Sequence, residues 1–452
     1  MSHAKKTAFQ QDLTTGKITS KLWLFALPLM VGNVMQQFYN LVDTWVVGRY
    51  IGADALAAVG SAYAFMTFLI SVIIGLCLGC SAFFSIAIGQ KNDERIRNGI
   101  FLSFVMIGVV SLLLTVVVMG LLPEIIRLLQ VPEEVQKDMY IYLFYVMIGL
   151  PGTFLYNYFA NVLRGIGNSF VPLIFLGIAV LLNVGLDVAF VVGLGLGIKG
   201  AAIATTIAQY GAGIGLMIYS FMAYENLRPQ KQDCVWKRET IAQIMSLSGY
   251  TCLQQSVMNF GILMVQGIVN GFGTTVMAAF AVAVKIDSIA YMPVQDFGNA
   301  FSTFVAQNYG AQKRERIQQG IRKASVSVMI FCICISIIVF GFAENFMEIF
   351  IATDQTKIIA VGVQYLRIEG ACYIGIGILF MLYGYYRAVN IPQMSLVLTI
   401  ISLGSRVVLS LILSKISWIG VVGIWISIPI GWALADIVGL LMLRRTVRTK
   451  SY

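Results

Sequence analysis

The chain has 452 residues, of which 58% are hydrophobic and only 12% are charged, and its formal net charge is +10. Soluble domains have about 45–50% apolar and about 25% charged residues, and they must cover themselves with a polar surface. The composition therefore excludes a soluble protein and indicates an integral membrane protein.

Long apolar segments follow one another along the whole chain. A helix needs about 20 predominantly apolar residues to cross a bilayer. The predicted fold class is therefore an all-α membrane protein with twelve transmembrane helices. These lie at 20–48, 55–88, 98–122, 138–163, 170–194, 199–223, 241–270, 275–308, 323–345, 360–387, 394–416 and 419–442.

An internal repeat organises the chain. Residues 89–100 align with residues 310–321, and six of the twelve aligned positions are identical. Each copy contains six predicted helices, so both copies run the same way through the membrane, with a cavity expected between them. The predicted parts are an N-terminal tail (1–19), a first lobe (20–223), a linker (224–240), a second lobe (241–442) and a C-terminal tail (443–452).

The basic residues predict the orientation of the helices. Of the 31 Lys and Arg residues, 22 fall in the two tails or in loops on the same side as the N-terminus. By the positive-inside rule, both termini are expected in the cytoplasm of a multi-pass plasma-membrane protein. This topology also explains the net charge, so no nucleic-acid partner is expected.

No arrangement of residues supports an enzyme. The single histidine, His3, lies in the polar N-terminal tail, where it cannot complete a catalytic triad. Residues 195–200 match the G-x-G-x-x-G pattern but lie between two membrane helices, without the βαβ context of a nucleotide site. We expect neither catalysis nor an organic cofactor.

Two carboxylates of the first lobe fall inside predicted membrane helices, where an ionisable group costs about 2.5–3.5 kcal/mol and is usually functional. They are Asp43 and Asp187. Asn183 shares a helix face with Asp187, and the next helix carries Thr205 and Thr206. These oxygen ligands suit Na⁺, and a buried carboxyl group can instead carry a proton. Alternatively, Asp43 anchors its helix near the outer surface and Asp187 bonds Asn183 locally.

The second lobe does not repeat these carboxylates. The helix equivalent to that of Asp43 has Gln254 and Gln255 but no acidic residue. When the two copies of the repeat are aligned, Asp187 corresponds to Ser410. We therefore expect the coupling chemistry to lie in the first lobe.

The second lobe has other charged residues within its predicted helices. Lys285 and Asp287 are two residues apart, so they do not share a helix face. Arg406 stands where the first lobe has Asn183. Pairing between helices and contact with a substrate both remain open for these three residues. Glu369 and Asp436 are expected to make peripheral polar contacts.

Several short sequences together resemble the multidrug and toxic compound extrusion (MATE) transporters over nearly the whole chain. They are Ala-Leu-Pro-Leu at 26–29, Asn-Leu-Val-Asp-Thr at 40–44, Ala-Ala-Val-Gly at 57–60, Leu-Arg-Gly-Ile-Gly-Asn at 163–168 and Gln-Asn-Tyr-Gly-Ala at 307–311. The resemblance implies a V-shaped pair of six-helix lobes of the MATE/MOP type. A DinF-like pattern within the family would place ion coupling at Asp43, Asn183, Asp187 and Thr205, which would also be the metal ligands if the ion is Na⁺.

The resulting functional hypothesis is a cation-coupled antiporter, acting as a monomer in the lipid bilayer. It would exchange H⁺ or Na⁺ for cationic amphipathic drugs by alternating access. An alternative is a flippase for lipid-linked oligosaccharides, in which Lys285 and Arg406 bind a phosphate. The predicted substrate cavity is lined by Gln36, Asn40, Gln254, Gln255, Lys285, Asp287 and Arg406.

Overall fold

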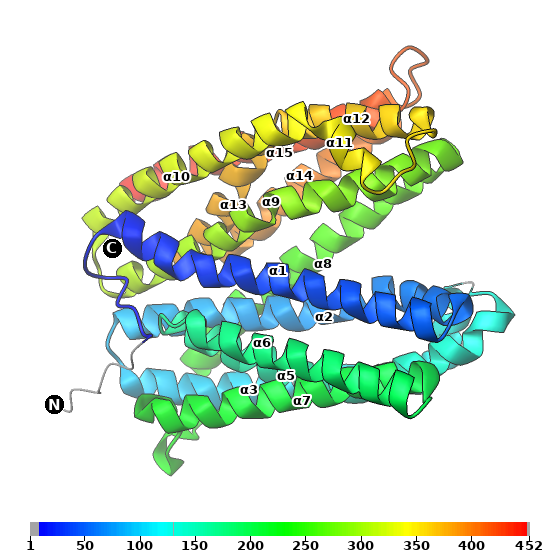
Figure 1. Ribbon diagram of the computed structural model, residues 1–452. Helices are drawn as coiled ribbons and strands as arrows, with labels where there is room; N and C mark the ends of the chain where they lie inside the picture. Colours follow the sequence, from blue (N-terminus) through cyan, green and yellow to red (C-terminus); the bar gives the residue numbers. More distant parts are fainter. Residues whose placement is uncertain (1–8, 130, 450–452) are drawn as a thin grey trace. The chain divides into compact units, whose positions relative to one another are not determined.

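The structure is a computed structural model that describes residues 9–129 and 131–449. Within these residues the secondary structure is helical, with no strand (Figure 1). His3 and the other residues of the N-terminal tail before position 9 lie outside the described residues, as do the last three residues of the C-terminal tail.

Most of the helices are long enough to span a bilayer. Eleven of the described helices pass by length and composition, or twelve if one bent pair forms a single span. This confirms the predicted all-α membrane fold. The helices of the first half are α1 (Ile18–Tyr50), α2 (Ala53–Gly89), α3 (Asp93–Gly120), α4 (Leu122–Leu128), α5 (Glu133–Gly165), α6 (Phe170–Asp187) with a π-helical end (Val188–Gly193), and α7 (Gly197–Ala223).

The second half repeats this order. Its helices are α8 (Arg238–Asn270), α9 (Thr274–Gly310), α10 (Arg314–Gly341), α11 (Ala343–Glu348), α12 (Thr356–Gly370), α13 (Tyr373–Ala388), α14 (Pro392–Leu413) and α15 (Val422–Thr449). Two short 3₁₀ turns, Glu225–Leu227 and Lys231–Asp233, lie in the linker.

One predicted span is broken. The helix expected over 360–387 consists of α12 and α13, which meet at an angle of 53°. The amide of Cys372 donates to the carbonyl of Glu369 at 2.8 Å, three residues back. Such a bond tightens the last turn of a helix and ends its regular pattern.

The chain forms two compact units. The first comprises residues up to Asp12 together with Leu27–Cys252, and the second comprises Leu13–Ala26 together with Leu253–Tyr452. The start of α1 therefore belongs with the second-half helices, and the start of α8 belongs with the first-half helices.

In the first unit, α5 packs along both α7 and α2. Aromatic side chains, among them Phe83, Phe154 and Tyr158, fill the core of this unit. In the second unit, α13 packs on α9, and α14 packs on α15. The ring of Trp425 stacks on Phe280 at 5.3 Å between centroids.

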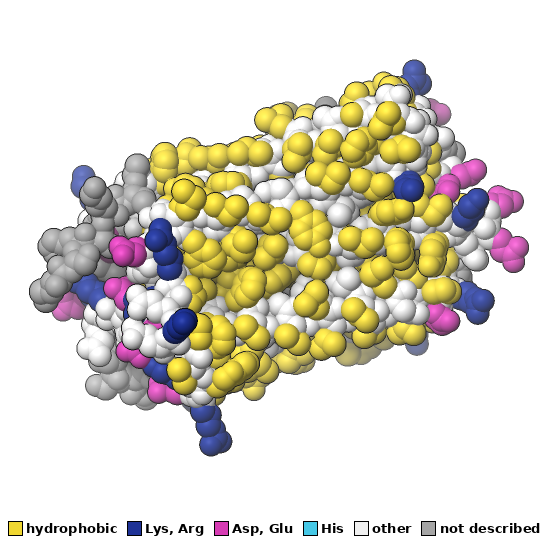
Figure 2. Space-filling model, turned by 90° about the horizontal axis from the view of Figure 1, so that it is seen from below, with side chains coloured by type: hydrophobic (Ala, Val, Ile, Leu, Met, Phe, Trp, Pro, Cys, Tyr) yellow, Lys and Arg dark blue, Asp and Glu magenta, His cyan; other side chains and the backbone are white. Residues whose placement is uncertain are grey.

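The surface matches a lipid environment. Large apolar side chains are widely exposed, for example Val116, Leu181 and Ile337, each at 67% or more. Figure 2 shows hydrophobic side chains over the middle of one face and charged side chains at its two ends. Apolar side chains facing outward across such a width are favourable in lipid and costly in water.

Two glycines of α2 let the start of α8 approach closely. A Cβ added to Gly79 would lie 2.4 Å from the carbonyl oxygen of Leu247, and one added to Gly75 would lie 2.6 Å from the Cα of Cys252. Small residues at such positions allow membrane helices to pack backbone to backbone. The contact holds the beginning of α8 on the first unit.

We expect Gly79→Ala to destabilise the protein, because the new methyl group meets rigid backbone rather than a flexible side chain. The cost should be at least about 1–3 kcal/mol, as for overpacking elsewhere. Gly60→Ala in the same helix is the control, because a Cβ there meets nothing within 4 Å. Thermal unfolding in detergent measures both variants. Equal unfolding temperatures for the two would contradict the close approach.

Candidate functional site

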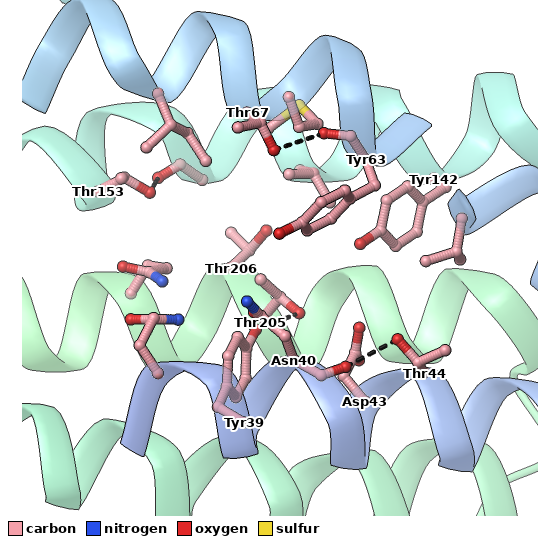
Figure 3. A pocket seen from close by; sticks show the side chains of 17 residues that line it. Tyr39, Asn40, Asp43, Thr44, Tyr63, Thr67, Tyr142, Thr153, Thr205 and Thr206 are labelled. Atoms are coloured by element: carbon pink, nitrogen blue, oxygen red, sulfur yellow. Dashed lines mark hydrogen bonds between the residues drawn. The ribbon is translucent and has the colours of Figure 1, made fainter. Parts of the chain in front are cut away.

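A polar cavity of about 150 Å³ lies inside the first unit (Figure 3). Four helices line it: α1, α2, α5 and α7. The polar side chains around it include Gln36, Tyr39, Asn40, Asp43, Tyr142 and Thr205. The cavity thus brings together four predicted site residues, namely Gln36, Asn40, Asp43 and Thr205.

The face of α1 explains why its residues meet there. Gln36, Asn40 and Asp43 are spaced by four and three residues, and residues at these spacings lie on one side of a helix. Asp43 is only 7% exposed, and its Oδ1 atom has no hydrogen-bond partner among the described residues. Figure 3 shows Asp43 beside Asn40 and Thr44 on this helix.

The other predicted carboxylate is more deeply buried. Asp187 ends α6, has no exposed surface, and neither of its carboxylate oxygens has a hydrogen-bond partner among the described residues. One turn earlier, the amide of Asn183 donates to Oγ1 of Thr205 on α7 at 3.4 Å. The same hydroxyl lies 3.3 Å from the hydroxyl of Tyr39 on α1.

Through these hydrogen bonds, Thr205 links α1, α6 and α7. Asp43 and Asp187 interact electrostatically with one another and with Tyr39. The structure places Asp43, Asn183, Asp187 and Thr205 in one neighbourhood of the first unit.

Two tyrosines of this neighbourhood were not predicted from the sequence. Tyr39 precedes Asp43 by one helical turn, and this spacing could have identified it. Tyr142 comes from α5, and its hydroxyl is in electrostatic range of both carboxylates. No sequence signal distinguishes Tyr142, because tyrosine is frequent in this chain, with 20 copies.

The arrangement is suited to a small cation. A buried ionised carboxylate without a partner is very costly, so it takes up a proton or coordinates a cation. Among residues 9–129 and 131–449, no three His, Cys, Asp or Glu side chains cluster as metal ligands. The oxygens of two carboxylates, an amide and hydroxyls remain, a set that suits H⁺ or Na⁺.

The size of the cavity supports the same assignment. A cavity of about 150 Å³ has room for several water molecules or ions. Pockets for drug-sized ligands measure about 300–1,000 Å³. In this conformation the cavity accommodates ions and water rather than a drug-sized molecule.

A second group of buried acids lies in the second unit. Tyr373 donates to Oδ1 of Asp287 at 2.7 Å, and Tyr365 donates to Oδ2 at 3.5 Å. The carboxyl group of Glu369 interacts electrostatically with that of Asp287, and Arg406 interacts electrostatically with both. Unlike Asp187, Asp287 has partners for both of its oxygens.

The expectation that Glu369 and Asp436 are peripheral is wrong, because they are 1% and 7% exposed. Glu369 stands next to the break between α12 and α13, and the bend there was not evident from the sequence. Lys285 is exposed while Asp287 is buried, in agreement with their expected placement on different faces.

The other second-lobe residues of the predicted substrate cavity differ in how deeply they are buried. Gln254 is buried and Gln255 is half-buried, and their contact with substrate stays a prediction. Arg406 is half-buried, with its guanidinium 5.9 Å from the ring of Trp432. Ser410, the equivalent of Asp187, is paired with the hydroxyl of Ser427 at 2.7 Å. No charge replaces Asp187 at this position.

A multi-span helical protein with a polar, carboxylate-lined cavity has the features of a membrane transporter. Comparison with known proteins agrees. The MatE family model matches residues 28–189 and again residues 251–412. Because the same model matches once in each half, the comparison confirms the internal repeat. The chain belongs to this family, the MATE multidrug efflux transporters.

Relatives and solved structures extend over nearly the whole chain. The probable multidrug resistance protein YpnP of Bacillus subtilis is 29% identical, with 96% of each chain covered. YoeA, a probable multidrug resistance protein of the same organism, is 27% identical, with 95% of each covered. An outward-facing multidrug resistance MATE transporter of the MOP superfamily superposes with a TM-score of 0.92 at 22% identity, covering 99% of this chain and 100% of the other.

We expect Arg406→Leu to destabilise the second unit by about 2–3 kcal/mol, because it leaves the charge shared by Asp287 and Glu369 without its positive partner. Adding Asp287→Asn should recover about 1 kcal/mol or more, since the asparagine still accepts the hydrogen bond from Tyr373. Unfolding of the single and double variants in detergent measures this coupling.

Lys285→Leu is the control for the second unit, because this lysine is exposed. Its unfolding temperature should stay close to that of the unmodified protein. A loss as large as that of Arg406→Leu would contradict a specific pairing of Arg406 with the buried acids.

Proposed function

We propose that the protein is a secondary antiporter that exports organic cations in exchange for H⁺ or Na⁺. The observation that carries the proposal is the state of Asp187. This carboxylate is fully buried in the first unit, beside Asn183 and Thr205, and neither of its oxygens has a partner among the described residues. Such a group is stable only with a bound proton or cation, so it can act as the coupling site.

Asp43 extends this site into the cavity. Because the two carboxylates interact electrostatically, a cation bound at one of them lowers the cost of burying the other. When the cation leaves, the cavity carries negative charge, which favours a cationic substrate. Competition between coupling ion and substrate for the same charge is the simplest form of exchange.

The membrane potential can drive such a cycle. Each elementary charge that moves inward gains about 2.3 kcal/mol per 100 mV, in addition to its concentration gradient. The distribution of Lys and Arg supports placing both termini in the cytoplasm, so the coupling ion would enter as the substrate leaves. Several relatives are named as multidrug resistance proteins, which supports small amphipathic substrates.

The flippase alternative requires a free basic site for a phosphate. Of the two basic residues that this alternative uses, Arg406 interacts with the buried acids Asp287 and Glu369, which reduces its attraction for an anion. Lys285 is exposed and would have to hold the phosphate without that arginine. The geometry therefore favours the antiporter.

We expect Asp43→Asn and Asp187→Asn each to lower gradient-driven efflux from proteoliposomes by at least about tenfold. Either change removes a charge that the coupling ion must neutralise, and loss of one coupled charge removes about 2.3 kcal/mol per 100 mV. The control is Asp54→Asn, an exposed acid at the start of α2. Unchanged efflux in both site variants would contradict the proposal.

The coupling ion can be identified with the unmodified protein. A pH gradient and a Na⁺ gradient are imposed separately on the same proteoliposomes, with the membrane potential clamped. We expect one of the two to drive substrate against its gradient, with the response lost in Asp187→Asn. If neither gradient drives transport of any organic cation tested, while a lipid-linked sugar is moved, the flippase replaces the antiporter.

A further inference from the structure

Two arginines at equivalent positions of the repeat have the same surroundings in their two units. Arg95 lies in the first turn of α3, and Arg316 lies at the matching position in the first turn of α10. The guanidinium carbon of Arg95 lies 5.7 Å from the centre of the Phe83 ring, and that of Arg316 lies 5.5 Å from the Phe304 ring. The two phenylalanines are also equivalent in the repeat, because each precedes its arginine by the same interval.

A glycine fixes each of these rings. A Cβ added to Gly99 would lie 2.3 Å from the Phe83 ring, and one added to Gly320 would lie 2.2 Å from the Phe304 ring. The glycine allows the ring to lie directly against the helix, and the arginine covers the ring as a cation–π partner. Each guanidinium is therefore held in a defined place at the start of its helix.

Arg316 binds the backbone that leads into α1. It donates to the carbonyl oxygens of residues 13, 15 and 16 at 2.8–3.2 Å. Lys313 donates to the carbonyl of Thr14 at 2.8 Å, and the amide of Leu13 donates to the side chain of Gln307 at 3.3 Å. The acceptors are four consecutive carbonyls, so these bonds fix the position of the chain whatever its side chains are.

Arg95 binds the start of α8, in this case through side chains rather than backbone carbonyls. It donates to the side-chain oxygen of Gln243 at 2.5 Å and lies 3.8 Å from the carboxylate of Glu239. Both partners belong to the first two turns of α8. The arginine therefore holds the beginning of the first helix of the second half.

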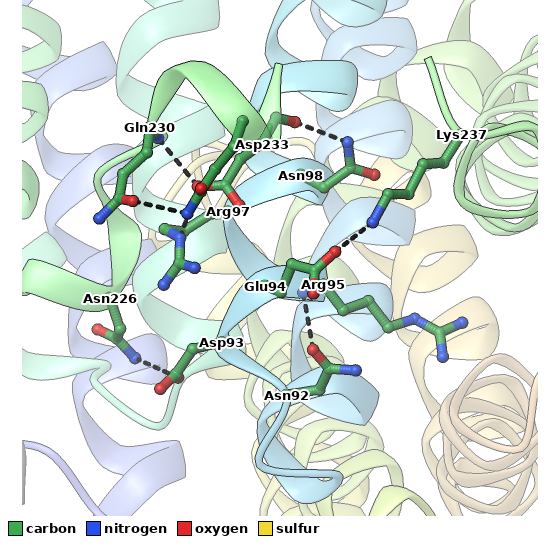
Figure 4. Close-up of polar contacts among 11 residues, drawn as sticks. Asn92, Asp93, Glu94, Arg95, Arg97, Asn98, Asn226, Gln230, Asp233 and Lys237 are labelled. Atoms are coloured by element: carbon green, nitrogen blue, oxygen red, sulfur yellow. Dashed lines mark hydrogen bonds and ion pairs between the residues drawn. The ribbon is translucent and has the colours of Figure 1, made fainter. Parts of the chain in front are cut away.

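Neighbouring residues of α3 hold the linker that precedes α8 (Figure 4). Arg97 pairs with Asp233 at 2.7 Å, and Glu94 pairs with Lys237. Asn98 donates to the backbone carbonyls of Asp233 and Val235 at 2.8 and 2.7 Å. Burial acts to raise the pKa of Asp233, but the hydrogen bonds from Arg97 and Gln230 outweigh it, and the pKa lies below its usual value.

The helices that Arg316 and Arg95 hold, α1 and α8, are each divided between the two units. Residues 13–26 belong to the second unit, while the rest of α1, which carries Asp43, belongs to the first. Conversely, α8 belongs to the first unit as far as Cys252 and to the second from Leu253 onward. Each half thus holds, by its own arginine, the start of the helix that opens the other half.

We propose that Arg95 and Arg316 are positioning residues that anchor the starts of α8 and α1 to the opposite half of the repeat. Each anchor keeps one end of its helix fixed while the remainder follows its own half through the transport cycle. The role in transport rests on the proposed antiport, whereas the anchoring itself does not. Arginine suits the task, because its planar fork holds five donors in a fixed geometry, whereas a lysine has three donors on one flexible ammonium group.

Hydrogen exchange of the full-length protein tests the anchors directly. In Arg316→Ala, the amides of residues 11–24 should exchange about tenfold faster or more, because local opening no longer has to break the charge-assisted bonds. Residues 236–248 should exchange as before. Arg95→Ala should give the opposite pattern, with faster exchange in residues 236–248 only.

Arg322→Ala is the matched control, because Arg322 is an exposed arginine on the same helix as Arg316. It should leave both segments unchanged. If Arg316→Ala does not fold, Arg316→Lys keeps the test open and should show an intermediate increase in residues 11–24. The proposal is overturned if exchange there is unchanged in both Arg316 variants, or if it rises equally in both segments.

A transport measurement then tests the functional part. Arg316→Ala should lower the turnover of substrate several-fold and leave substrate affinity within about twofold, since the residue lies outside the polar cavity. An equal loss of affinity would indicate a damaged site instead of a lost anchor. If the unmodified protein transports no cation, the antiport fails, while the exchange result still decides the anchors.

Discussion

The need to neutralise buried charge governs the arrangement of both units. Lipid offers no hydrogen bond to a polar group, so each carboxylate needs a partner within the protein, water in a cavity, or a bound proton or ion. The second unit surrounds Asp287 with Tyr373, Glu369 and Arg406. The first unit leaves Asp187 without a hydrogen-bond partner among the described residues. This difference distinguishes Asp287, which its neighbours stabilise, from Asp187, and it is the basis of the coupling role that we propose for Asp187.

The internal repeat explains where the two halves agree and where they differ. At the starts of α3 and α10, an arginine, a phenylalanine ring and a glycine recur at equivalent positions with nearly the same geometry. Inside the helices, Asp187 of one half is replaced by Ser410 in the other, and Ser410 is satisfied by Ser427. The shared positions belong to the framework, and the differing positions leave Asp187 without an ionisable counterpart in the second half.

The sequence alone was sufficient to predict the membrane-spanning helices, apart from the break between α12 and α13, and the burial of Asp43 and Asp187, because apolar length and the cost of a buried charge are local properties. It could not show that Glu369 is buried, since this depends on a bend at Ala371 and Cys372 that no proline marks. Nor could it select Tyr142, whose role depends on how α5 faces α1. The close approach of Gly79 to Leu247 likewise requires knowledge of which helices are neighbours.

The start of helix α1 is held by hydrogen bonds, whereas the later part of the helix carries the ionisable Asp43. Its start is held through backbone carbonyls by Arg316, and these bonds do not depend on any protonation state within the membrane. Asp43 lies about seven turns after Ile18, or about 38 Å along a straight helix, and in the proposed antiport its charge depends on the bound ion. Pro28 lies between them and removes one backbone hydrogen bond, so the helix bends most easily there. In that antiport, a change of charge at Asp43 would act on the part of α1 beyond the proline, while the anchored start remains in place.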